Sequence, residues 1–239
     1  MNATVVVPVV FHIVLPNPNI VTTNQILAQL DSLNKDFSNT NGSSGLTPAW
    51  FQALRGKSQI QFCLAQRTPD GEETNGINRI PTNVAIFNLD DRIKTTVAGG
   101  ADSWDTEKYL NVWICAQDDG ILGFATFPTT TEPKYQGVVV DYRSHAGAAY
   151  PSYTNYNRGK TLTHEIGHYF GLFHIWGDDD GRCTGTDFVN DTPNQADASE
   201  GCRTGRITDS CTATGDGIMY QNYMDYSYDN CLTLFTTGQ

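Results

Sequence analysis

Three histidines and one glutamate between residues 164 and 174 have a spacing that suits a single metal ion. His164 and His168 are four residues apart, so on a helix both imidazoles project from the same face. Gly171 can adopt a positive φ, which ends the helix and allows His174 to turn back toward the same ion. Three imidazoles leave the fourth tetrahedral position of Zn²⁺ to water, which is the arrangement of a catalytic zinc site rather than a structural one.

Glu165 is the residue whose position suits a general base. It lies about 100° around the helix from His164, where it can reach a zinc-bound water without ligating the ion. Zinc lowers the pKa of such a water toward about 7, and Glu165 can take its proton as the water attacks a peptide carbonyl. The pattern H-E-x-x-H-x-x-G-x-x-H fixes five positions. This disfavours the alternative of a helix whose histidines occur by chance and bind no metal. His12 and His145 are expected to be structural or surface residues.

The charge of the chain is negative and unevenly distributed. Of the net charge of −11, −8 arises from residue 178 onward, where eleven acidic residues face three basic ones. This balance argues against nucleic acid as a partner, because no basic face is offered to phosphates. It is compatible with calcium or a cationic substrate, although charge alone favours a solvated acidic surface. The longest apolar run, 5–15, is too short to cross a bilayer, so no membrane association is expected.

The chain has six cysteines, and the last four fall in its acidic, helix-poor third: Cys63, Cys115, Cys183, Cys202, Cys211 and Cys231. A stretch that cannot build its own core gains stability from crosslinks, and no C-x-x-C pair suggests a zinc ribbon. We therefore expect two disulfides and a secreted protein, with three pairings open. Cys63 and Cys115 are expected on buried strands, and a bond between them is left open. Any leader or pro-segment is expected outside this chain.

The elements that must position the zinc residues are predicted from apolar periodicity. Strands are expected at 4–15, 60–66, 110–115, 123–127 and 137–142, and helices at 25–37 and 160–171. Beyond residue 177 the periodicity disappears until a short segment at 232–235. These patterns predict one α/β domain over residues 1–239, with an upper subdomain (1–170) and an irregular, crosslinked lower subdomain (171–239). The zinc motif falls at their junction, where a cleft is expected.

The eleven-residue motif resembles the metzincin clan of metalloendopeptidases, which also carries a methionine turn below the zinc. Residues 221–227, Gln-Asn-Tyr-Met-Asp-Tyr-Ser, match that turn. By this resemblance Met224 forms an apolar floor under the histidines, and Tyr226 helps to stabilise the tetrahedral intermediate. The finer similarity is to the pappalysin family and extends over nearly the whole chain. It is carried by the zinc motif and by residues 62–65, 111–114, 137–142, 187–193 and 222–231.

The pappalysin resemblance implies an α+β fold of the metzincin type. Its upper lobe holds a mixed five-stranded sheet, a backing helix and the active-site helix, and a cleft separates it from an irregular lower lobe. The resemblance also implies the disulfides Cys183–Cys211 and Cys202–Cys231. One or two structural calcium ions are implied, bound by Asp187, Asp191, Thr192 and the Val189 carbonyl. A plain turn through Asp-Thr-Pro is the alternative for that loop.

Asp229 matches the acidic residue at the base of the family's pocket for the side chain just after the scissile bond. A carboxylate there prefers Arg or Lys, whereas a surface acid in a turn is the alternative. The resemblance thus implies a secreted zinc endopeptidase, monomeric or weakly dimeric, that cuts proteins or peptides on the N-terminal side of Arg or Lys. Its substrate would lie extended along residues 122–127.

Two other functions compete with this expectation. A non-catalytic, calcium-dependent binding module is disfavoured by Glu165, since a purely structural zinc has no use for a base. A metal-dependent hydrolase of small esters or amides is disfavoured by the strand expected beside the cleft.

Overall fold

The computed structural model describes residues 3–128, 132–147 and 153–239. The strands and longer helices, in chain order, are β1 (Val5–Leu15), α1 (Thr23–Phe37), β2 (Ile60–Leu64), β3 (Ile77–Pro81), β4 (Leu110–Cys115), β5 (Gly123–Ala125), β6 (Val138–Asp141) and α2 (Lys160–Tyr169). Short 3-10 helices lie at Pro18–Ile20, Ser43–Leu46, Gln52–Leu54, Asp91–Lys94, Thr96–Ala98 and Pro133–Tyr135. Within the described residues, no helix has the length and apolar character needed to cross a membrane.

The strands form one mixed six-stranded sheet. Five of them lie in the order β2-β1-β4-β6-β5, as expected, and β3 is an additional strand that pairs with β1. All neighbours pair in parallel except β5, which runs antiparallel to β6 at the edge. The long β1 pairs with β2 through its first half and with β3 through its second half. The short strand β3 was not expected, because its partly exposed sequence Ile-Asn-Arg-Ile-Pro has little apolar signal.

The two helices cover one face of the sheet. α1 begins at a capping box, in which Gln25 N donates to Thr22 Oγ1 (3.3 Å) and Thr22 N donates to Gln25 Oε1 (2.7 Å). Apolar residues from both helices pack with the sheet in one buried cluster that includes Phe11, Ile13, Leu33, Leu162 and Ile166. The opposite face is covered by residues 84–101, which pack on Trp113 and Val139.

A buried carboxylate joins α1 to α2 and to the C-terminal part of the chain. Asp36 of α1 pairs with Lys160 Nζ of α2 at 2.6 and 2.8 Å. It also accepts from Thr163 Oγ1 (2.7 Å) and from the Tyr223 hydroxyl (2.9 Å). With a further bond from Asn41 Nδ2 (3.1 Å), five donated hydrogen bonds compensate the burial of this charge, which would otherwise be costly. The start of the active-site helix is therefore fixed to both parts of the molecule.

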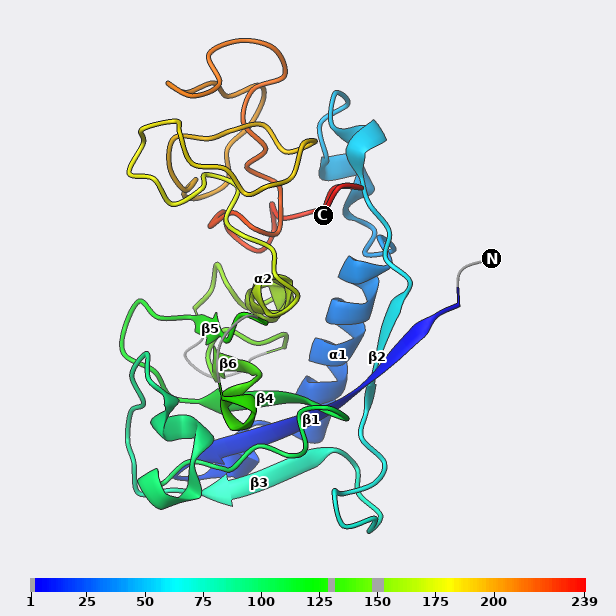
Figure 1. The fold of residues 1–239 in the computed structure, drawn as a ribbon, viewed down its shortest axis with the longest axis vertical. Coiled ribbons are helices and arrows are strands. Elements are labelled where there is room, and N and C mark those ends of the chain that lie inside the picture. The colour runs from blue at the N-terminus through cyan, green and yellow to red at the C-terminus, as the bar shows by residue number, and fades with distance from the viewer. Residues whose placement is uncertain (1–2, 129–131, 148–152) are drawn as a thin grey trace.

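Residues 170–239 contain only turns and isolated bridges, and Figure 1 shows them on the far side of α2 from the sheet. The disulfides Cys183–Cys211 and Cys202–Cys231 are both present, which confirms the pairing implied by the resemblance. Cys63 and Cys115 are free, on strands β2 and β4 that are separated by β1.

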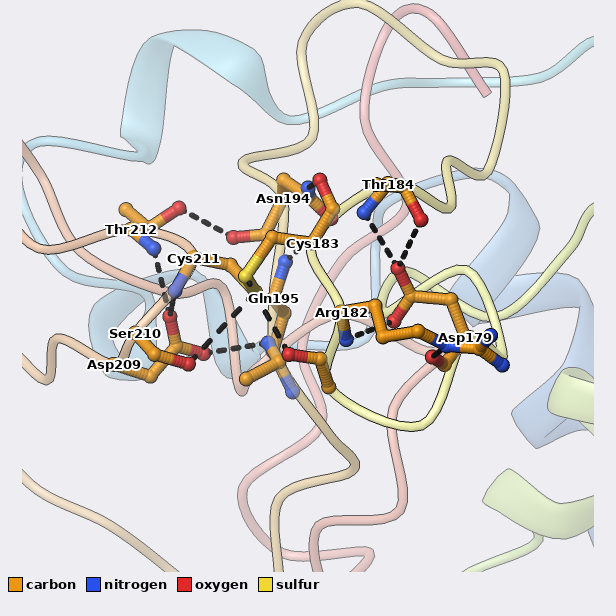
Figure 2. The surroundings of a disulfide bond; sticks show 12 residues. Asp179, Arg182, Cys183, Thr184, Asn194, Gln195, Asp209, Ser210, Cys211 and Thr212 are labelled. Carbon is orange, nitrogen blue, oxygen red and sulfur yellow. Dashed lines mark hydrogen bonds between the residues drawn. A yellow bond between two sulfur atoms is a disulfide. The ribbon is translucent and has the colours of Figure 1, made fainter.

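In this region, carboxylates accept hydrogen bonds from backbone N–H groups that have no neighbouring strand to bond to (Figure 2). Asp209 accepts from the backbone N–H groups of Ala196, Cys211 and Thr212, beside the Cys183–Cys211 disulfide. Asp179 accepts from Thr184 N and Gly185 N, both at 2.6 Å. Backbone donors that have no ladder to join are satisfied in this way.

Removing the partner of Asp36 is expected to be strongly destabilising. Lys160→Met leaves a buried carboxylate unpaired, which costs about 3–5 kcal/mol of the free energy of unfolding. The matched control is Lys35→Met, because Lys35 pairs with Asp31 at the same 2.6 Å but with side chains 50 % and 61 % exposed. That exposed pair is worth about 0–1 kcal/mol. Urea unfolding of both variants checks this, and equal losses would contradict the structural role of Asp36.

Candidate active site

The active-site helix α2 ends where the third histidine has to turn back. It extends from Lys160 to Tyr169, two residues shorter than expected, and Gly171 has φ 94°. This left-handed conformation is open to glycine at little cost. It returns the chain toward the helix, so that His174 faces His164 and His168.

The imidazole rings of the three histidines converge. His168 Nε2 lies 3.0 Å from both His164 Nε2 and His174 Nε2. Each Nδ1 instead has an oxygen acceptor: the Tyr223 carbonyl for His164 (2.7 Å), the Leu172 carbonyl for His168 (2.7 Å) and the Asp178 carboxylate for His174 (2.9 Å). These acceptors assign the ring proton to Nδ1 in all three residues. The three Nε2 lone pairs therefore point at one common site.

This donor set fits a zinc ion. Tetrahedral zinc binds imidazole nitrogens at about 2.0–2.1 Å, which places ligand atoms roughly 3.3 Å apart, close to the separations found here. Burial lowers the pKa of His168 to about 4 and also lowers the pKa values of His164 and His174, so the rings are neutral, as metal ligands must be. In the described parts of the chain, no other group of three His, Cys, Asp or Glu residues has comparable geometry. The expected three-histidine zinc site is confirmed.

Glu165 is buried between α2 and the edge strand β5. Its burial raises its pKa to about 8, a shift that the positive charge of a neighbouring zinc ion would oppose. A Cβ atom on Gly123 of β5 would lie 3.1 Å from Glu165 Cγ and 2.7 Å from the Val139 carbonyl oxygen. Only a residue without a side chain allows β5 to approach the glutamate this closely.

β5 presents an open edge beside the glutamate. Within the described residues, β6 is its sole strand partner. Asp141 N donates to Leu122 O, and Thr126 N donates to Gly137 O. The alternation of an antiparallel ladder therefore turns the backbone groups of Gly123 and Ala125 away from β6.

The turn around Met224 lies directly against α2. Met224 is fully buried, and a Cβ atom on Gly167 would lie 2.5 Å from its sulfur. The preceding residue, Tyr223, supplies the carbonyl that accepts from His164. The turn is itself fixed by Asn222, whose Oδ1 accepts from Met224 N at 2.8 Å.

Three further side chains surround the third histidine. The Tyr226 ring lies 5.0 Å from His174 and 5.5 Å from His164, and burial followed by the Glu165 charge raises its pKa to about 12. Trp176 stacks on His174 with a centroid distance of 4.1 Å. Trp176 and Asp178 were not identified from the sequence. The only available signal was their position two and four residues after His174.

Asp229 is an interior residue rather than a surface acid in a turn. Its exposed fraction is 3 %, and its Oδ2 accepts from Arg158 N (2.7 Å) and Lys160 N (3.3 Å). It thus caps the first turn of α2, where Gly159 at the N-cap has no side chain to do so. Burial raises the pKa of Asp229 to about 6.

The loop expected to bind calcium brings together three of its four predicted oxygen donors. Thr192 Oγ1 donates to Asp187 Oδ2 (2.6 Å) and lies 2.9 Å from the Val189 carbonyl oxygen. Asp191 instead accepts from Thr236 Oγ1 (2.6 Å) and Gly238 N (2.8 Å), near the end of the chain.

Comparison with known proteins places this site in a family. Residues 65–239 match the model of the M43 peptidases, described as pregnancy-associated plasma protein-A. An extracellular metalloprotease from Neurospora crassa is 36 % identical over 248 residues, covering 100 % of this chain and 73 % of that protein. One from Sordaria macrospora is 46 % identical over 140 residues, covering 56 % of this chain and 46 % of that protein. Mature mirolysin from Tannerella forsythia, in complex with a cleaved peptide, has a TM-score of 0.95 and 43 % identity, covering 100 % of this chain and 89 % of that one.

These similarities agree with the geometry of the site. The relatives are extracellular metalloproteases, in keeping with the two disulfides of this chain. The family match includes all three histidines, Glu165 and the methionine turn. The chain belongs to the M43 or pappalysin family and is an extracellular zinc metalloprotease with a fold close to that of mirolysin.

Proposed function

We propose that this metalloprotease is an endopeptidase that cuts extended polypeptides on the N-terminal side of Arg or Lys. The observation that carries the proposal is the position of Glu165 between the three-histidine site and the open edge of β5. An extended peptide can add to such an edge through main-chain hydrogen bonds. This arrangement favours polypeptides over small esters, which cannot use the strand.

The residues of the chain divide the reaction between them. Bound zinc would supply a Lewis acid that polarises the substrate carbonyl and acidifies a water molecule. Glu165 is the group that takes the proton of that water and passes it to the leaving amine, because it is buried beside the three-histidine site and lies against the open edge of β5. The Tyr226 hydroxyl stays protonated at neutral pH and can donate a hydrogen bond to the developing oxyanion. Met224 packs against Gly167 of α2 and so supports the helix that carries His164 and His168.

Replacement of the base tests the assignment of Glu165. Glu165→Ala is expected to retain one zinc per chain and to lose about 10²–10⁴-fold in kcat for casein and peptide cleavage, the range that general-base catalysis supplies. Zinc content by atomic absorption and peptide cleavage by mass spectrometry measure the two effects. A fully active variant would refute the role of Glu165. Binding of proteins without cleavage by the wild type would favour the binding-module alternative.

The preference for Arg or Lys is proposed for Asp229. Its carboxylate is buried beside Lys160, the first residue of α2, which precedes His164 by four residues. Its Oδ2 atom already accepts from two backbone N–H groups. Oδ1 has no hydrogen bond among the described residues and is the atom we propose for a basic substrate side chain. An ionised carboxylate in a buried position pairs well with a guanidinium or ammonium group.

Asp229→Asn separates this charge from the helix cap, because the amide oxygen still accepts from Arg158 N and Lys160 N. We expect the kcat/KM ratio of Arg over Gln substrates to fall roughly 30-fold or more, as truncating a buried charge pair costs about 2–5 kcal/mol. In the wild type the ratio should also fall as pH drops below about 6, because Asp229 becomes protonated. Cleavage-site profiling between pH 5 and 8 measures both. An undiminished basic preference in the Asn variant would exclude Asp229.

We also propose one structural calcium ion at the 187–192 loop, bound by Asp187, Thr192 and the Val189 carbonyl. Their oxygen atoms already converge, and calcium prefers such donors. Calcium at about 100 times its Kd should raise Tm by roughly 5–10 °C. Asp187→Asn should abolish this rise, as measured by thermal unfolding with calcium or EGTA. An equal rise in the variant would rule out this loop as the site.

A further inference from the structure

Three phenylalanines form a chain of ring contacts that begins at the zinc site. The Phe127 ring, just after β5, lies 5.1 Å from the ring of His168. Phe173 lies 5.2 Å from Phe127, and Phe188 lies 5.5 Å from Phe173. The exposed fraction is 40 % for Phe173 and 77 % for Phe188. Connected rings that remain this accessible mark binding surfaces more often than ordinary protein exterior.

Phe188 reaches this position at a conformational cost. Its φ of 63° lies in the left-handed region, which a bulky aromatic residue rarely adopts. The loop is fixed on both sides, since Asp187 accepts from Val189 N (3.0 Å) and from Thr192 Oγ1 (2.6 Å). Strained residues that the surrounding structure maintains cluster at functional sites. The backbone here presents an aromatic ring to solvent rather than burying it.

The direction of a bound substrate follows from β5. The Gly123 end of this region lies against Glu165, and the Phe127 end lies against His168. A peptide that pairs antiparallel with β5 runs the opposite way, so its residues before the scissile bond lie at the Phe127 end. Its residues after the bond lie toward the start of α2, where Asp229 is buried. The C-terminal end of α2 therefore lies beside the substrate residues before the scissile bond, and its N-terminal end lies beside those after the bond.

We propose that Phe127, Phe173 and Phe188 form a specificity surface for large apolar or aromatic side chains that precede the scissile bond. This inference rests on the proposed endopeptidase function and adds a second determinant to it. The successive ring distances of 5.2 and 5.5 Å let the three rings reach at most roughly three residues of an extended peptide, at about 3.3 Å per residue. Preferred substrates therefore carry an apolar residue within about three positions before the cut and a basic residue directly after it.

Matched peptides and phenylalanine variants test this surface. Pairs of peptides with one fixed basic residue differ only by Leu or Phe against Ser at the second and third positions before the cut. The wild type should favour the apolar member by about 10-fold or more in kcat/KM, the effect of one well-placed apolar side chain. In Phe188→Gly, whose glycine accepts the positive φ, and in Phe173→Ser, the ratio should fall several-fold toward one.

Phe170→Ser is the matched control. Its exposed fraction is also 40 %, but its ring packs on Phe37 and Phe62 instead of on the phenylalanines of the proposed surface. Its apolar ratio should equal that of the wild type. Thermal unfolding of each variant excludes misfolding as the cause of a change.

The outcomes separate this inference from the proposed function. A wild-type ratio near one, or a ratio unchanged in both Phe188→Gly and Phe173→Ser, overturns the specificity surface even if cleavage before Arg or Lys persists. If the wild type favours the apolar peptides but shows no preference for Arg or Lys after the cut, the Asp229 proposal alone is contradicted. The same peptides are also compared by fluorescence anisotropy on Glu165→Ala, where the apolar member should bind several-fold more tightly. Equal affinity in that protein would likewise overturn the proposal.

Discussion

The position of a proton on each histidine is the constraint on which the site depends. A ring whose Nδ1 donates to an oxygen acceptor presents an unprotonated Nε2 to the metal, and the acceptor also fixes the plane of the ring. Only His164 and His168 lie on a helix, and neither finds its acceptor there. The acceptors are Tyr223 O, Leu172 O and Asp178, all in the irregular part of the chain. Small shifts in that part would reorient the ligands even with α2 intact.

The irregular part is ordered by buried and half-buried carboxylates, and this gives its negative charge a structural role. Asp225, 2 % exposed, accepts from Ser199 N and Tyr226 N and from the Gln195 amide. Asp179, Asp209 and Asp229 likewise accept from backbone donors. Burial raises the pKa of Asp225, a cost that its three hydrogen bonds partly offset. The acidic stretch is therefore partly an internal scaffold rather than only a solvated surface.

The sequence was informative where a short pattern determines a local geometry. The H-E-x-x-H-x-x-G-x-x-H spacing predicted the zinc ligands because helix periodicity and one positive φ suffice to bring them together. Alternating and helical apolar runs predicted five strands and both helices. The sequence was uninformative about contacts between segments that are far apart in the chain. Nothing in the sequence paired Asp36 with Tyr223 or stacked Trp176 on His174, and β3 depends on β1 for its identity as a strand.

The two disulfides enclose overlapping stretches of chain, 183–211 and 202–231. Any single break in the backbone between Cys183 and Cys231 is therefore spanned by at least one of them. Between Cys202 and Cys211 both span it, and that short interval contains Arg203 and Arg206. Both arginines are exposed to solvent. A backbone break next to either arginine would leave two covalently linked pieces, with every zinc ligand still attached to the remainder of the molecule.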